Sequence, residues 1–121
     1  MHVLIVEDDH RLRRILKRLL EEERHVVEVA ADGGEGLELA AGLNGIDVVI
    51  LDLQLKKGTG FGVLRALRKI LKRPAVVVFT NFSLPTYRET ALELGAEHFL
   101  DKSRDYERLP EVLNEISARH H

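Results

Sequence analysis

The chain has 121 residues, of which 45% are hydrophobic and 31% are charged, and its formal net charge is -2. This length suits one compact domain, and this composition can bury a core, which argues against intrinsic disorder. The near balance of 18 basic and 20 acidic residues does not favour nucleic acid or an anionic membrane as the main partner, and the lack of Cys excludes disulfides and thiolate metal sites.

The N-terminus offers only the short apolar run Val3–Val6 before it turns acidic at Glu7. A run of this length is too short for a signal peptide or a membrane span. Together with the absence of Cys, it leads us to expect a cytoplasmic protein.

Short apolar runs then alternate with amphipathic stretches along the whole chain. Most of the runs are rich in Val and Ile, as is typical of strands buried on both faces of a parallel sheet. We predict strands over Val3–Val6, His25–Val29, Ile46–Leu51, Ala75–Phe79 and His98–Leu100.

Between these runs, apolar residues recur at the three- and four-residue spacing of a helix. The longer stripes are Leu12, Ile15, Leu16, Leu19 and Leu20; Val63, Leu64, Leu67, Ile70 and Leu71; and Leu109, Val112, Leu113 and Ile116. The shorter stripes are Leu37, Ala40 and Ala41, and Tyr87, Ala91 and Leu94. Strict alternation of five strands with five helices predicts a single α/β domain with helices on both faces of a parallel sheet.

Polar residues follow four of the predicted strands. These strand ends are Glu7-Asp8-Asp9, Asp52, Thr80-Asn81 and Asp101-Lys102-Ser103. The carboxyl ends of parallel strands open onto one edge of a sheet, so we expect three or four acids, a hydroxyl and an ammonium to meet there. Clustered carboxylates suit a hard cation such as Mg²⁺, and a lysine and a hydroxyl complement a phosphoryl group. A carboxylate at the metal can act as a nucleophile.

Each of these residues also has a purely structural interpretation. Asp9 can be only the N-cap of the next helix, and Asp52 can be a turn residue. Thr80 can be an ordinary β-branched strand residue, and Lys102 a solvated charge. The functional interpretation is favoured because four such residues coincide at one predicted edge.

These motifs, in this order and spacing, resemble the response-regulator receiver family of two-component signalling along nearly the whole chain. The matching segments are 6–9, 48–53, 58–60 with Val63-Leu64, Thr80, 94–96 and 99–102. The resemblance implies a CheY-like, flavodoxin-like doubly wound (βα)5 fold with strand order 2-1-3-4-5. We expect the receiver to occupy residues 1–119, as a single-domain or isolated receiver, and we interpret His120 and His121 as a purification-tag remnant.

The resemblance also implies a metal and acceptor site. Asp52 would be the phosphoacceptor and a metal ligand, and Asp8 would bind Mg²⁺ directly. Glu7 would reach the ion through water, and the backbone carbonyl of Gln54 would be a further protein ligand. Mn²⁺ would be a substitute for Mg²⁺.

The implied cycle begins with transfer of a phosphoryl group to Asp52 from a sensor histidine kinase or a phosphotransfer protein. Lys102 would contact that group, Thr80 would be the switch hydroxyl, and Phe99 the rotameric switch aromatic. The protein would be a phosphoacceptor that assists its own phosphorylation and dephosphorylation, not an enzyme.

The predicted fourth helix, fifth strand and fifth helix would form the face that contacts a downstream protein target or output domain. The resemblance also allows a homodimer. We expect no direct contact with nucleic acid or membrane, because no segment remains for a separate DNA-binding unit.

Some positions depart from the family pattern. Lys56 stands where a proline is usual, which removes a rigid turn and adds charge near the acidic pocket. Asn81 is bulkier than the usual small residue, and with Phe82 it is expected to narrow the access to Asp52. Ser103 replaces a proline and leaves the preceding peptide geometry open.

Two alternatives belong to other functional classes. The altered loop and Asn81 are compatible with a receiver-like protein-binding module that acts without phosphorylation. A hydrolase or phosphotransferase is disfavoured, because Gln54 stands where an aspartyl phosphatase needs a second acid and no Gly-rich nucleotide loop follows the first strand.

Overall fold

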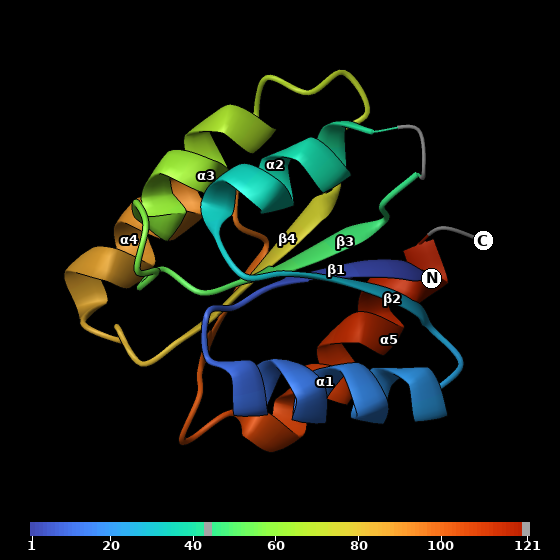
Figure 1. The fold of residues 1–121 in the computed structure, drawn as a ribbon. Coiled ribbons are helices and arrows are strands. Elements are labelled where there is room, and N and C mark those ends of the chain that lie inside the picture. The colour runs from blue at the N-terminus through green and yellow to red at the C-terminus, as the bar shows by residue number, and fades with distance from the viewer. Residues whose placement is uncertain (43–44, 120–121) are drawn as a thin grey trace.

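The computed structural model describes residues 1–42 and 45–119, which form one sheet with helices on both sides (Figure 1). The elements are β1 (His2–Val6), α1 (His10–Glu22), β2 (Val26–Ala30), α2 (Gly33–Ala41), β3 (Val48–Leu51), α3 (Gly60–Leu67), β4 (Ala75–Thr80), α4 (Pro85–Glu93), β5 (His98–Asp101), the 3-10 turn η1 (Tyr106–Arg108) and α5 (Leu109–Arg119). No helix within these ranges combines the length and hydropathy that a membrane span requires. His120 and His121, interpreted above as a tag remnant, lie outside the described residues.

The five strands are all parallel and lie in the order β2-β1-β3-β4-β5, which confirms the predicted fold class. The register pairs Val6 with Leu51, so the ends of β1 and β3 lie level with each other. The chain passes from β1 to β2 on one side and then returns to add β3 on the other. This reversal places the crevice of the open sheet between the carboxyl ends of β1 and β3.

The helices form two layers over the sheet (Figure 1). Helices α1 and α5 cover one face, and α2, α3 and α4 cover the other. Because successive strand residues point to opposite faces, Val3 and Ile5 pack with α1 and α5, whereas Leu4 and Val6 pack with α2 and α3. The central strands are therefore buried on both faces, as their Val- and Ile-rich sequences predicted.

Two of the predicted helical stripes include residues that the structure leaves exposed. Helix α3 ends at Leu67. The amides of Lys69 and Ile70 donate to carbonyls three residues back, and not to those four residues back as in an α-helix. Leu71 consequently lies off the buried face and is 99% exposed. In α1 the stripe is too wide, since Ile15 is 52% exposed. Periodicity alone did not show where the helix stops or how much of its face is covered.

Candidate functional site

Asp52 lies directly after β3, and the residue is almost fully buried at 4% exposure. Its Oδ1 accepts hydrogen bonds from the Thr80 hydroxyl at 2.7 Å and from the Gln54 backbone N–H at 3.0 Å. Its Oδ2 accepts from Lys102 Nζ at 2.7 Å. Groups from three different strand ends thus fix both oxygens of one carboxylate.

Two more acids lie beside Asp52. Glu7 is 2% exposed; its Oε1 is 2.7 Å from Lys102 Nζ, and its Oε2 accepts from the Asp9 backbone N–H at 3.0 Å. Asp8 is half-buried, and its Oδ2 accepts from the Lys56 backbone N–H at 2.8 Å. One carboxylate oxygen of each of Glu7, Asp8 and Asp52 lies within 4.8 Å of the others. This oxygen-only set has the chemistry that a hard divalent cation requires.

Burial and pairing determine the protonation of this cluster. Burial raises the pKa of Glu7, and the hydrogen bond and charge of Lys102 offset only part of that effect. Burial alone would lower the pKa of Lys102, but its hydrogen bonds to Asp52 and Glu7 prevail and raise it above its ordinary value. Lys102 is therefore a positively charged group paired with the two buried carboxylates, those of Glu7 and Asp52.

Two acids that follow or end strands, Asp9 and Asp101, lie outside the cluster. Asp9 is the N-cap of α1, and its Oδ1 accepts from the amides of Arg11 at 2.9 Å and Leu12 at 3.1 Å. These bonds lower the pKa of Asp9. Asp101 instead stabilises the turn after β5, where its Oδ1 accepts from the amides of Ser103 and Arg104. The structural interpretation of Asp9 is therefore the one that the geometry supports.

The β4–α4 segment borders the cluster on another side. The Thr80 hydroxyl, which donates to Asp52, also accepts from the Phe82 backbone N–H at 3.1 Å. Asn81 is exposed, and Phe82 is 36% exposed and stacks on Tyr87 at 5.1 Å between ring centroids. Phe99 is buried, and it also lines a hollow of about 150 Å³ between α4 and the β5–α5 segment.

The segment between β3 and α3 is more ordered than its lack of a proline led us to expect. Gln54 and Thr59 form an antiparallel bridge that closes the loop, and the Gly60 amide donates to the Leu53 carbonyl at 2.9 Å. Gly58 has a φ of +79°, a conformation that favours glycine. The predicted loss of a rigid turn is thus compensated by the bridge and by the bond from Lys56 to Asp8.

Sequence reasoning missed two groups that support the cluster. One is the Lys56 backbone amide. The other is Arg13, whose guanidinium donates to the Glu7 carbonyl oxygen at 2.8 Å and so holds the turn between β1 and α1. The only indication in the sequence was that Arg13 lies in the first turn of the helix capped by Asp9, from which a long side chain can reach back to the strand end. The peptide bond before Ser103, left open by the sequence, is trans.

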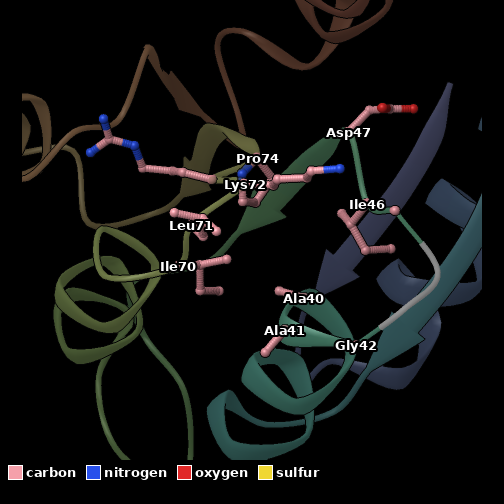
Figure 2. A pocket seen from close by; sticks show the side chains of 11 residues that line it. Ala40, Ala41, Gly42, Ile46, Asp47, Ile70, Leu71, Lys72 and Pro74 are labelled. Carbon is pink, nitrogen blue, oxygen red and sulfur yellow. The ribbon is translucent and has the colours of Figure 1, made fainter.

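A larger hollow of about 650 Å³ lies at the opposite edge of the sheet, before the first residues of β3 and β4 (Figure 2). Figure 2 shows Ile70 and Leu71 on one side of it and Ala40, Ala41 and Ile46 on the other. Its lining is mostly apolar, and the Asp47 carboxylate at its rim accepts from the His2 amide at 2.8 Å. None of the clustered acids lines it, so its size does not mark the functional site.

An open parallel sheet that gathers acids, a buried hydroxyl and a lysine at its carboxyl edge defines a class of doubly wound α/β domains with a cation-compatible acidic site. The sequence model of the response regulator receiver domain matches residues 3–114. The chain belongs to the response regulator receiver domain family of two-component signalling, whose members are phosphoacceptors.

Curated relatives agree with this assignment. The transcriptional regulatory protein CpxR of Escherichia coli is 36% identical over 119 residues, which cover 98% of this chain and 50% of CpxR. The uncharacterised transcriptional regulatory protein YkoG of Bacillus subtilis is 36% identical over 108 residues, or 89% of this chain and 47% of YkoG. The chain thus spans about half the length of the curated relatives it matches.

Solved structures agree as well. A Francisella response regulator receiver domain superposes with a TM-score of 0.89 at 25% identity, covering 99% of this chain and 98% of that one. The response regulator TrrA of Thermotoga maritima, solved in complex with Mg²⁺ and BeF, superposes with a TM-score of 0.82 at 28% identity, covering 96% of this chain and 99% of that one.

Proposed function

We propose that Asp52 is the residue that accepts the phosphoryl group in this receiver. The supporting observation is its environment: a nearly buried carboxylate held by the Thr80 hydroxyl, the Lys102 ammonium and a backbone amide. In the reaction, a phosphohistidine N–P bond of a partner protein breaks and an O–P bond to Asp52 forms. Lys102 and Thr80 then lie where they can bind the oxygens of the transferred group.

Mg²⁺ is the cofactor that this site fits, because its three acidic side chains offer only oxygen ligands. Asp8 and Asp52 would bind it directly, Glu7 through water, and Gln54 through its backbone carbonyl. When bound, Mg²⁺ supplies positive charge that offsets the clustered carboxylates and the charge of the transferring phosphoryl group.

Phosphorylation would change the partners of Thr80. Its hydroxyl now joins Asp52 to the Phe82 amide, so a hydroxyl that turns toward the new phosphoryl group pulls on the β4–α4 segment. Phe99, which lines the hollow between α4 and the β5–α5 segment, would change rotamer in response. The face of α4, β5 and α5 would then alter its affinity for a target or output domain, while a histidine kinase or phosphotransfer protein is the donor.

The test is labelling by acetyl phosphate in the presence of Mg²⁺, followed by intact-mass measurement and acid-stability analysis of the label. The wild type should gain one phosphoryl group with the stability of an acyl phosphate, and Asp52→Asn should gain none. Asp101→Asn, which changes an acid outside the cluster, is the matched control and should label normally. Labelling that persists in Asp52→Asn moves the acceptor to Asp8 or Asp9. A wild type that neither labels nor responds to beryllofluoride supports the phosphorylation-independent module.

A further inference from the structure

One hydrogen bond at the acidic cluster joins two loops that are far apart in sequence. The Lys56 backbone N–H, in the β3–α3 segment, donates to Asp8 Oδ2 at 2.8 Å across a separation of 48 residues. We propose that this amide is a positioning group, which orients the Asp8 carboxylate so that its second oxygen is available to a divalent cation. The inference rests on the proposed function, in which Asp8 is a metal ligand.

Asp8 has fewer other partners than the other two clustered acids, and because a proline without an N–H is usual at position 56 in the family, the contact is a feature of this chain. Glu7 and Asp52 are buried, and each is held by Lys102 and by a backbone amide. Asp8 is only half-buried and makes none of these contacts. Without the Lys56 amide, its side chain would be free to change rotamer and to bond to water. Groups that orient metal ligands in this way strengthen metal binding without touching the ion.

The segment that presents the amide is fixed at several points. The bridge between Gln54 and Thr59 closes it, and Leu55, immediately before Lys56, is buried in the core. Thr59 accepts from the Gly62 amide and so caps α3. A donor on such a segment keeps its place when the Asp8 side chain moves, which is the condition for positioning a ligand.

The side chain of Lys56 takes no part in the bond to Asp8. It is exposed, and none of the ion pairs among residues 1–42 and 45–119 involves it. The backbone donor can therefore be removed independently of the charge. Proline has no N–H, so Lys56→Pro deletes both donor and charge, while Lys56→Ala deletes the charge alone.

The decisive experiment compares the Mg²⁺ dissociation constants of the wild type, Lys56→Ala and Lys56→Pro by isothermal titration, with circular dichroism to confirm folding. We expect Lys56→Ala to bind within about threefold of the wild type and Lys56→Pro to bind about tenfold more weakly or worse. Equal affinities in the two variants, or tighter binding by Lys56→Pro, would overturn the inference while leaving the metal site intact. A wild type that does not bind Mg²⁺, or an Asp8→Asn variant that binds as the wild type does, overturns the metal assignment and this inference with it.

Amide hydrogen exchange, followed by ¹⁵N-resolved NMR, tests the same bond even if Lys56→Pro does not fold. The Lys56 amide should be protected in the wild type, should remain protected when Mg²⁺ is added, and should exchange quickly in Asp8→Ala. Exchange that becomes faster on Mg²⁺ addition would mean that the ion replaces the bond instead of relying on it. That outcome would overturn the inference.

Discussion

Burial makes the three clustered carboxylates chemically different. Asp8 is half-buried and open to water, whereas Glu7 lies behind it with almost no exposed surface. Burial therefore raises the pKa of Glu7, and that shift is the property of the cluster most directly accessible to experiment. Lys102 stays positively charged while Glu7 titrates, because the pKa of Lys102 is itself raised.

We predict that Mg²⁺ affinity decreases as the pH is lowered, and that the decrease begins at a pH where an exposed glutamate would still be ionised. The sign follows from the raised pKa of Glu7: its proton competes with the cation at a higher pH. The same shift destabilises the folded chain as the pH rises through the raised pKa. Isothermal titration at several pH values measures the effect. Glu7→Gln should bind more weakly but with a shallower pH dependence, and an unchanged slope in that variant would assign the titration to another group.

Asn81 follows Thr80, the residue proposed as the switch, and its side chain is exposed. If its bulk narrows the approach to Asp52, phosphorylation and dephosphorylation are slowed together, because both need an in-line approach to that residue. We predict that Asn81→Ala speeds acetyl-phosphate labelling and loss of the label by several-fold each. Asn114→Ala, the same change on the exposed side of α5, is the control and should alter neither rate. A change in dephosphorylation alone would show that the amide acts on water, and no change would show that Asn81 points away.

At the scale of elements, the start of α3 determines where Asp52 lies. A Cβ added to Gly60 would be 2.4 Å from the Asp52 carbonyl oxygen and 2.5 Å from Leu53 Cα. Both neighbours are backbone atoms of the segment that bears the acceptor, so they cannot yield without moving it. A Cβ on Gly62 in the same helix would meet only Thr59 Oγ1, at 3.9 Å.

Gly60→Ala should therefore destabilise the protein by about 2 kcal/mol or more, as overpacking of a closely packed site does. Gly62→Ala is the matched control, and it should be neutral or stabilising by up to about 1 kcal/mol because alanine favours the helix. Urea unfolding followed by circular dichroism measures both. We also expect only Gly60→Ala to weaken Mg²⁺ binding. Equal stabilities of the two variants would contradict the close approach of α3 to Asp52.

At the scale of the whole molecule, two apolar clusters share one sheet. One contains β1 residues such as Leu4 and packs against α2, α3 and α4; the other contains Val3 and packs against α1 and α5. Tyr87 lies against the first cluster and Tyr106 against the second. Because each central strand contributes to both clusters, neither face can lose its packing while the other keeps it.

We predict a single cooperative unfolding transition that is the same on both faces. The chain has two Tyr and no Trp, so Tyr87→Phe leaves only Tyr106 as a fluorescent reporter, and Tyr106→Phe leaves only Tyr87. In each variant the urea midpoint from tyrosine fluorescence should coincide with that from far-ultraviolet circular dichroism. A fluorescence transition that precedes the dichroism transition in one variant would show that its face melts separately.

The fold class and the meeting of polar side chains at one edge of the sheet could be predicted from sequence, because both depend on local patterns. Runs of Val and Ile marked the buried strands, and the alternation of strands and helices required a parallel sheet. Parallel strands all place their carboxyl ends at one edge, so Glu7, Asp52, Thr80 and Lys102 had to approach one another. The predicted strand bounds needed only small corrections, such as the inclusion of Thr80 in β4.

Only the tertiary structure decided how the polar groups share their partners. Asp8 and Asp9 are adjacent in sequence, yet one bonds to a loop 48 residues away and the other caps its own helix. Leu71 continues a helical stripe but lies in solvent, because α3 ends four residues earlier. A periodic pattern records which residues favour burial, whereas the end of a helix and the direction of a carboxylate depend on competing contacts that arise only when distant segments pack together.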